Sequence, residues 1–254
     1  MCLIAFAWDN HPKYKLILAA NRDEFYERPT SPAGFWDDKP QIFGGRDLKA
    51  LGTWMGVSKD GRFGALTNYR DLKNIKPDAK SRGDIVTGFL DNNGGPENFV
   101  KQLHEQADDY NGFNFLGCDF KTMIHYSNYE RKLNIVKPGI HGLSNALLDT
   151  SWPKVDELKK NFKEAITEDF SHEDLLSLLT PTETFEDEVL PNTGVSRELE
   201  KSLSAICIRT EKYGTVGSTV LTVDRFGKVD FTEKTYGVAD REENTVNFEF
   251  EIKV

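Results

Sequence analysis

The 254-residue chain is poor in cysteine, and it has no long apolar run. Three cysteines, Cys2, Cys118 and Cys207, are too few and too scattered for a disulfide framework, and they form no CxxC pair of the kind that binds metals. No stretch approaches the roughly 18 apolar residues that a membrane-spanning helix needs. A sparse, odd cysteine count is typical of a reducing compartment. We therefore expect a cytoplasmic protein with no integral membrane association.

Positive charge is also scarce. The chain has 32 Lys and Arg against 41 Asp and Glu, a net charge of −9, and it contains no basic run, which argues against a nucleic-acid partner. The apolar segment 2–8 has no basic residue before it and is followed at once by Asp9, so we expect no signal peptide. The five histidines form no HExxH motif, and we predict no metal site.

Apolar runs bounded by turn residues predict antiparallel strands. The runs 2–8 and 14–20 flank a polar turn and predict a hairpin. The runs 53–57 and 63–68 predict a second hairpin, because the glycine between them, Gly61, accepts a positive φ without steric cost. Further strands are predicted at 113–117, 122–126, 132–136, 205–208, 218–223, 228–232 and 246–252. A turn is predicted over 213–218, before the strand at 218–223.

Helical signals lie between the blocks of strands. Ser81 and Asp84 predict a capping box that opens a helix over 84–90, and Ser171 and Asp174 predict another. Two more helices are predicted, one beginning at Pro96 and one carrying the apolar positions Trp152, Val155, Leu158, Phe162 and Ile166.

This order of elements predicts a layered architecture. The acidic segment 182–195 indicates an exposed excursion, and it is the one feature that favours an interaction module. No linker or repeat divides the chain, so we predict a single domain over residues 1–254. Helices that insert in pairs between antiparallel strands favour an α+β fold over a doubly wound parallel sheet.

Cys2 is the first candidate for chemistry. Methionine aminopeptidase removes Met1 when the next residue is small, as cysteine is. The mature chain then begins with a thiol and a free α-amine on one residue, and the amine can act as the general base of the thiol. Their reference pKa values, about 7.7–8.0 and about 8.5, are close enough for proton exchange near neutral pH. Taken alone, Cys2 fits equally a small buried hydrophobe in the first strand, which is the commoner role.

The polar tetrapeptide 21–24 follows the second apolar run directly. In the predicted hairpin Cys2 lies opposite residue 20 or 21, so Arg22 and Asp23 fall beside the N-terminus. A cation lowers the pKa of a nearby thiol, and a carboxylate can hold and orient an ammonium group. The alternative is a charged strand end exposed to water.

Asn68 and Asn145 each follow an apolar segment, where a strand should end. Asparagine side chains in such positions can donate hydrogen bonds to an oxyanion, and one such donor lowers a barrier by about 2.7–4 kcal/mol. Taken singly, each is more commonly a turn residue.

Short motifs are spread along nearly the whole chain. They are Met1-Cys2, Ala20-Asn21-Arg22-Asp23-Glu24-Phe25, Gly45-Arg46-Asp47, Gly52-Thr53-Trp54, Leu66-Thr67-Asn68, Ser81-Arg82-Gly83, Gly142-Leu143-Ser144-Asn145 and Trp152-Pro153-Lys154. In this order they resemble the NRDE family, also called the Transport and Golgi organisation protein 2 family. The string at 21–24 alone is weak evidence, whereas the ordered set is specific.

The resemblance implies a relation to the N-terminal-nucleophile (Ntn) hydrolases and their four-layer αββα fold, in which helices flank two antiparallel sheets. It implies that Cys2 is the nucleophile and that Asn68 and Asn145 are the oxyanion donors. Arg22 and Asp23 occupy the region of an arginine and an aspartate in the cysteine amidases that act on bile-salt and penicillin V amides. In those amidases the two residues stand three apart, whereas here they are adjacent.

Two details of this comparison stay open. The first is which of Arg22, Asp23 and Glu24 contacts the sulfur of Cys2. The second is whether Arg209 supplies the arginine that the amidases carry on a late strand.

The sequence thus supports two functions. The first is an Ntn-type cysteine amidohydrolase that acts on a small linear amide after removal of Met1 and requires no cofactor. The second is a non-catalytic carrier of a hydrophobic ligand on the same fold, which the resemblance links to intracellular haem or lipid trafficking. In the second case His141 or Cys2 would contact the haem iron.

Overall fold

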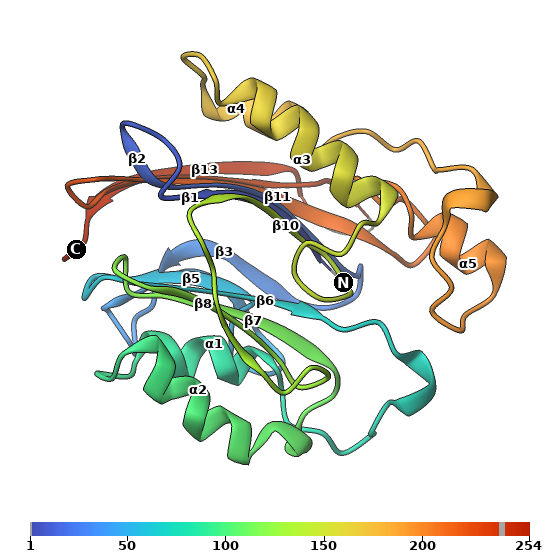
Figure 1. Ribbon diagram of the computed structural model, residues 1–254, viewed down its shortest axis with the longest axis horizontal. Coiled ribbons are helices and arrows are strands. Elements are labelled where there is room, and N and C mark those ends of the chain that lie inside the picture. The colour runs from blue at the N-terminus through green and yellow to red at the C-terminus, as the bar shows by residue number, and fades with distance from the viewer. Residues whose placement is uncertain (1, 239–241) are drawn as a thin grey trace.

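Two antiparallel sheets face each other in the computed structural model, which describes residues 2–238 and 242–254 (Figure 1). Sheet A, the upper one in Figure 1, has the strand order β10 (Gly139–Leu143), β1 (Cys2–Trp8), β2 (Tyr14–Phe25), β11 (Tyr213–Asp224), β12 (Lys228–Thr235) and β13 (Asn244–Glu251). Sheet B has the order β3 (Thr30–Phe35), β4 (Ile42–Asp47), β5 (Met55–Ser58), β6 (Arg62–Asn68), β7 (Phe113–Cys118), β8 (Met123–Ser127) and β9 (Leu133–Ile135).

Helices cover the outer face of each sheet. Helices α3 (Pro153–Ala165) and α4 (His172–Ser177) pack on sheet A, and α1 (Gly83–Leu90) and α2 (Pro96–Glu105) pack on sheet B (Figure 1). The short α5 (Arg197–Ser202) lies to the side, and 3-10 turns occupy Leu72–Asn74, Ala107–Asp109 and Asp187–Val189. The layer order is helix, sheet, sheet, helix, which confirms the predicted α+β class and the αββα sandwich.

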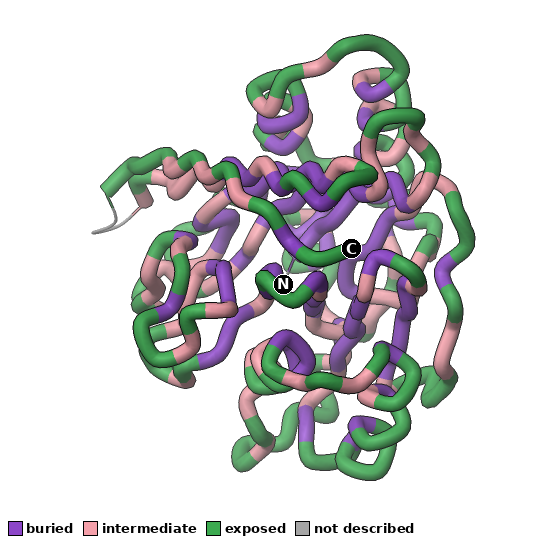
Figure 2. The backbone as a smooth tube through the Cα atoms, turned by 90° about the vertical axis from the view of Figure 1, so that its left-hand side faces the viewer, coloured by how far each residue is buried: buried purple, intermediate pink, exposed green. Residues whose placement is uncertain are grey.

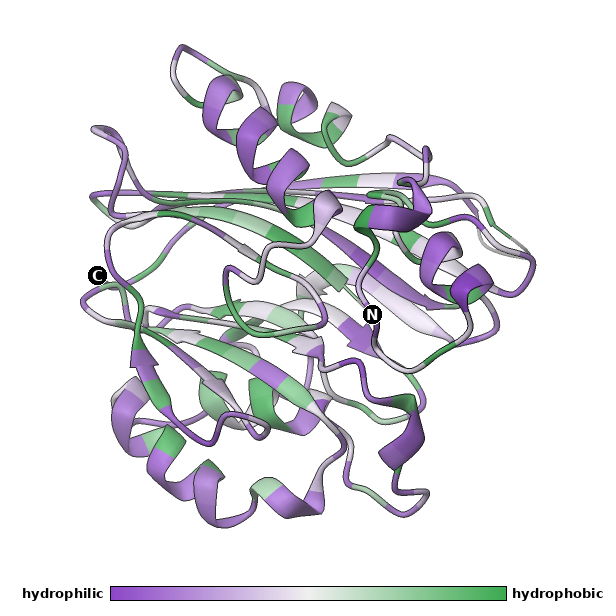
Figure 3. Cartoon of the chain, turned by 45° about the vertical axis from the view of Figure 1, so that its right-hand side comes forward, coloured by the Kyte–Doolittle hydropathy of each residue, from purple (hydrophilic) through white to green (hydrophobic). Residues whose placement is uncertain are grey.

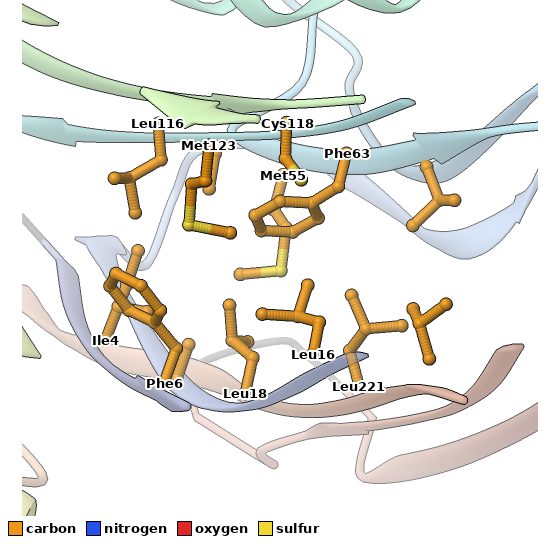
Figure 4. Packing of buried hydrophobic residues seen from close by; sticks show 14 of the residues in the cluster. Ile4, Phe6, Leu16, Leu18, Met55, Phe63, Leu116, Cys118, Met123 and Leu221 are labelled. Atoms are coloured by element: carbon orange, nitrogen blue, oxygen red, sulfur yellow. The ribbon is translucent and has the colours of Figure 1, made fainter. Parts of the chain in front are cut away.

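Side-chain alternation along β1 fills two separate cores. Ile4 and Phe6 point toward sheet B, whereas Leu3 and Ala5 point toward α3 and α4. Because both faces of β1 are covered, the strand is one continuous apolar run rather than an alternating one. Figure 4 shows the core between the sheets, where residues of the two sheets point toward one another: Ile4, Phe6, Leu16, Leu18 and Leu221 from sheet A, and Met55, Phe63, Leu116, Cys118 and Met123 from sheet B.

Residue burial and hydropathy follow the layered architecture. Buried residues are concentrated in the interior of the molecule, and exposed residues lie mainly at its periphery (Figure 2). Hydrophobic residues lie mainly on the strands, and hydrophilic ones cover much of the helices (Figure 3). No helix within residues 2–238 and 242–254 is long and apolar enough to cross a membrane.

Several local predictions are confirmed. Strands β1 and β2 form the first hairpin, and β5 and β6 form the second, with Gly61 at φ 82° in the turn between them. Ser171 and Asp174 form the predicted capping box of α4.

Three local predictions are wrong. Ser81 and Asp84 do not cap α1, whose N-cap is Arg82 with no side-chain hydrogen bond. The segment 205–208 is buried but is not a strand, since its Cys207 N–H donates to the Pro181 carbonyl of a distant loop at 2.7 Å. Residues 213–218 belong to β11 rather than to a turn, because β2 continues to Phe25 and pairs with them.

Phe43 tests the packing between the sheets. It is fully buried on β4, and its ring lies 4.8–5.0 Å from the rings of Phe231, Phe248 and Phe250 on the opposite sheet. We predict that Phe43→Ala lowers the free energy of unfolding by about 3–5 kcal/mol, because it leaves a cavity between the sheets. Urea denaturation measures the change.

Phe226→Ala is the matched control, because the side chain of Phe226 is 90% exposed. The same chemical change there should alter stability by less than about 0.5 kcal/mol. Equal losses in the two variants would contradict the proposed inter-sheet core.

Candidate active site

Cys2 lies directly opposite Arg22, at the open end of the β1–β2 hairpin. The register pairs Cys2 with Arg22, Leu3 with Asn21 and Ile4 with Ala20. The predicted partner, residue 20 or 21, is therefore wrong by one or two positions, since the turn is centred on residue 12. Residues directly opposite each other in an antiparallel pair share a face. The side chains of Cys2 and Arg22 thus lie on the face that Ile4 and Ala20 turn toward sheet B.

Asp23 directs its side chain to the other face of β2. Its carboxylate is buried and accepts a hydrogen bond from Thr215 Oγ1 at 2.7 Å. Burial raises the pKa of the Asp23 carboxyl, whereas Lys154 and the Thr215 hydroxyl act in the opposite direction. The backbone of Asp23, by contrast, acts to lower the pKa of the Cys2 thiol.

This arrangement shows how Arg22, Asp23 and Glu24 are placed around the sulfur of Cys2. Arg22 places its side chain on the same face as the thiol, and Asp23 contributes its backbone. Glu24 instead forms an ion pair with Arg22, with 3.6 Å between Arg22 Nη2 and Glu24 Oε2.

A cavity of about 860 Å³ opens beside Cys2. Its wall includes Cys2, Arg22, Asp23 and Asn68, together with residues of sheet B and of the α5 region. Seven basic side chains line the cavity against five acidic ones, although the whole chain carries a net charge of −9. The local charge therefore favours an anionic ligand.

The environment of Cys2 keeps its thiol protonated. The side chain is only 7% exposed. Burial raises the pKa of the Cys2 thiol and the Asp23 carboxylate adds to the rise, whereas the Arg22 guanidinium and the Asp23 backbone N–H oppose it. Because the pKa stays above its ordinary value, the thiol needs a base before it can act as a nucleophile.

The two asparagines occupy different positions. Asn68 ends β6 and lies on the cavity wall. Asn145 is buried behind it and is absent from the residues that line the cavity. The side-chain amide of Asn145 donates to the Asn68 carbonyl at 3.0 Å, and its own carbonyl accepts from the Arg70 backbone at 2.7 Å. Asn145 thus holds the segment that carries Asn68.

A buried ion pair that the sequence does not predict lies beside the cavity. Arg70 lines the cavity, and its Nη1 lies 2.8 Å from Glu200 Oε2, with both side chains at most 2% exposed. The guanidinium stacks over the Trp152 ring at 4.7 Å. Glu200 Oε1 accepts the backbone N–H of Thr193 at 2.7 Å. The pair therefore ties α5 and the loop before it to the cavity wall.

Lys154 is, after Arg70, a second buried cation that was not predicted from the sequence. Its Nζ donates to the Leu203 carbonyl at 2.9 Å. Burial lowers the pKa of the Lys154 ammonium to about 8, Arg70 acts in the same direction, and Asp23 and Cys2 oppose it. A signal was present, because a lysine in the first turn of a helix lies at the unfavourable end of the helix dipole.

Two other candidates lie elsewhere. Arg209 is exposed and absent from the cavity wall, with Nη1 donating to the Thr215 carbonyl at 2.7 Å and its guanidinium over the ring of Tyr236. His141 is also outside the cavity, and its ring nitrogens contact Asp149 Oδ2 at 2.7 Å and the Lys137 carbonyl at 2.8 Å. In the described part of the chain no group of three or more His, Cys, Asp and Glu residues is placed to bind a metal ion.

Taken together, the two antiparallel sheets and the helices on their outer faces define a four-layer αββα protein with Cys2 at the start of its first strand. Comparison with known proteins narrows the class. The chain belongs to the Transport and Golgi organisation 2 family, whose model matches residues 1–237.

Curated relatives agree with this assignment. The Transport and Golgi organization 2 homolog of Mus musculus is 37% identical over 257 residues, covering 92% of this chain and 93% of the mouse protein. The Homo sapiens homolog is 35% identical with the same coverage, and the Drosophila melanogaster protein is 31% identical over 268 residues, covering 92% of each chain. The resemblance inferred from the motifs is thereby confirmed.

Solved structures with a similar arrangement have low sequence identity. An orthologue of N-acylethanolamine-hydrolyzing acid amidase from Caenorhabditis elegans has a TM-score of 0.42 and 12% identity, covering 87% of this chain and 92% of that one. A variant of conjugated bile acid hydrolase from Clostridium perfringens has a TM-score of 0.42 and 11% identity, covering 99% of this chain and 89% of that one.

Glu200→Ala tests the buried ion pair. The substitution leaves the Arg70 guanidinium buried without its carboxylate, so we predict that the free energy of unfolding falls by about 3–5 kcal/mol. Chemical denaturation measures the loss. Glu198→Ala, an exposed glutamate on the same helix, is the control and should change stability by less than about 0.5 kcal/mol. A Glu200→Ala variant as stable as the control would show that the pair is solvated.

Proposed function

We propose that the chain, once Met1 is removed, is an Ntn-type cysteine amidohydrolase that cleaves a small linear amide. The observation that carries this proposal is the position of Cys2. It begins the first strand, lies on the cavity wall and pairs with Arg22, and the Asp23 backbone acts to lower the pKa of its thiol. A cysteine that only fills space needs neither a cation nor a hydrogen-bond donor beside its sulfur.

The reaction needs a base, and the α-amine of the processed Cys2 provides one. The amine takes the thiol proton as the sulfur attacks the amide carbonyl carbon. When the tetrahedral intermediate collapses, the C–N bond breaks and the ammonium returns the proton to the leaving amine, which leaves a thioester on Cys2. The amine then deprotonates a water molecule, which hydrolyses the thioester and releases a carboxylic acid and the free thiol.

The surrounding residues support each step. Asn68 lies on the cavity wall and is the proposed donor to the oxyanion. Asn145 is the second residue proposed to act at the oxyanion. Its hydrogen bond to the Asn68 carbonyl favours a role in positioning Asn68. Arg22 favours the thiolate electrostatically, whereas the buried Asp23 carboxylate raises the thiol pKa and so favours transfer of the thiol proton to a base only during attack.

Alkylation of Cys2 tests the proposal. We predict that iodoacetamide labels Cys2 in chains whose loss of Met1 is verified by mass spectrometry, and that the rate rises with pH as the thiol ionises. Arg22→Gln removes the neighbouring cation, so the pKa of the Cys2 thiol rises further. A rise of about one unit slows labelling about tenfold at neutral pH. The rate is followed by peptide mass spectrometry.

Arg28→Gln is the matched control. Arg28 also lines the cavity, but its Nε pairs with Asp47 Oδ2 at 2.6 Å. Labelling of Cys2 should stay within about twofold in this variant. The mechanism fails if Met1 is retained, or if Cys2 resists the reagent in the native protein and reacts only after unfolding.

The carrier is the second proposed function, and one observation favours it. Four exposed apolar residues, Phe25, Leu72, Ile75 and Leu199, line the cavity that holds Cys2. Such a surface suits a hydrophobic ligand. His141 lies outside the cavity, so Cys2 is the proposed contact if the ligand is haem.

A haem titration distinguishes the carrier from the enzyme. If the carrier binds haem through Cys2, a Soret shift appears at micromolar protein and is lost in Cys2→Ala, because that variant lacks the thiolate ligand. His141→Ala should leave the shift unchanged. Absence of a shift in the unmodified protein would count against haem as the ligand.

A further inference from the structure

One edge of the Arg70 guanidinium has no partner among residues 2–238 and 242–254. Nη1 donates to Glu200 at 2.8 Å, whereas Nε and Nη2 are buried and make no hydrogen bond. In a planar guanidinium the N–H bonds of Nε and Nη2 point in the same direction. The two unpaired donors therefore form one complete two-pronged edge.

Such an edge is unusual in a purely structural arginine. Buried donors are almost always hydrogen-bonded, and an unpaired charged donor is especially costly. The ring of Trp152 lies against a face of the guanidinium rather than against this edge, and Arg70 lines the cavity. The remaining donors therefore indicate a partner that is not part of the described chain.

The protein holds Arg70 firmly in place. Glu200 fixes Nη1, Trp152 covers the guanidinium plane at 4.7 Å, and the backbone N–H of Arg70 donates to the Asn145 carbonyl at 2.7 Å. A cation fixed in this way binds a ligand without first losing side-chain freedom.

The charges around Arg70 favour an anion that is distinct from the reacting group. Burial lowers the pKa of the Arg70 guanidinium, whereas Glu200, which accepts from Nη1, and Asp23 act in the opposite direction. Lys154 adds a second buried positive charge nearby. The guanidinium groups that interact with the Cys2 thiol are those of Arg22 and Arg82, so Arg70 is left for another part of the ligand.

We propose that the Nε and Nη2 edge of Arg70 binds a carboxylate group of the ligand that occupies the cavity. The two oxygens of a carboxylate match the two parallel donors, and such bidentate pairs are among the stronger hydrogen bonds in proteins. This inference rests on the proposed function only in taking the cavity beside Cys2 as the ligand site.

Benzoate is the probe, and benzamide is its uncharged analogue of nearly the same shape. Both are titrated into the full chain carrying Cys2→Ala, so that no covalent chemistry contributes. We expect benzoate to bind saturably and to shift the Arg70 Nε–H signal in the ¹H–¹⁵N spectrum, with little effect from benzamide. Inorganic phosphate, titrated separately, should bind more weakly than benzoate, because a tetrahedral anion fits the planar edge less well.

In the chain that carries Cys2→Ala, the substitution Arg70→Lys removes the two parallel donors of the Nε and Nη2 edge but keeps a positive charge beside Glu200. We expect benzoate affinity to fall about tenfold or more, because the bidentate contact is lost. Arg82→Lys is the matched control, since Arg82 also lines the cavity and uses Nη1 for the Gly112 carbonyl at 2.9 Å. The control should keep its benzoate Kd within about twofold.

Three results would overturn the inference. Benzoate affinity unchanged in a folded Arg70→Lys variant would remove Arg70 from the site. If benzoate does not shift the Arg70 Nε–H signal, the edge is hydrogen-bonded to a buried water instead of to the ligand. This measurement needs no Arg70 variant. Phosphate binding more tightly than benzoate would reject the carboxylate. Because Cys2→Ala cannot be alkylated or turn over, these results are independent of the labelling test, and either proposal can fail alone.

Discussion

The register between β1 and β2 is the constraint on which the site depends. It sets Cys2 against Arg22, and alternation then sends the Asp23 carboxylate to the opposite face of the sheet. A slip of one residue would exchange these faces and bring a carboxylate, in place of a guanidinium, to the thiol. The thiol pKa would then rise further. The apolar cores on the two faces of β1 hold the register, because the same slip would turn both of them inside out.

Among the described residues, two positive and two negative side chains are buried around this hairpin. Arg70 and Glu200 form an ion pair, while Lys154 and Asp23 influence each other through space. Apolar residues of similar size would often give equal or greater stability, so buried charges are weak evidence for a stabilising role. These four come from separate segments that surround the cavity, including β2, α3 and α5. Their arrangement fixes the shape and charge of the cavity at some cost to stability.

Local patterns predicted the hairpins and most of the helices, because strand alternation, turn glycines and helical spacing depend on neighbours in sequence. Strands β3 and β4 were missed, since Pro32, Gly34, Gly44 and Gly45 lower their β-propensity, and they are held in place by pairing within sheet B. The register was wrong because it depends on where the turn is centred, which composition does not specify.

The candidate site was predicted unevenly for a related reason. Cys2, Arg22 and Asp23 could be brought together by hairpin geometry alone, and Asn68 by its position at a strand end. Arg70 and Glu200 are 130 residues apart in the chain, so only the tertiary structure shows that they meet. Asn145 lies two residues after the end of β10, and its amide is directed to the backbone of a neighbouring segment, a distinction that strand patterns do not contain.

In the proposed enzyme, the buried thiol gives the removal of Met1 a chemical role. Burial raises the pKa of Cys2 more than Arg22 lowers it, so electrostatics alone does not give a thiolate at neutral pH. Before processing, the nitrogen of Cys2 is a peptide nitrogen, which donates a hydrogen bond but does not accept a proton. After processing it is an amine with a reference pKa of about 7.7–8.0 and can take the proton as the sulfur attacks. In the proposed enzyme, one proteolytic step therefore changes an inert buried cysteine into a nucleophile with its own base.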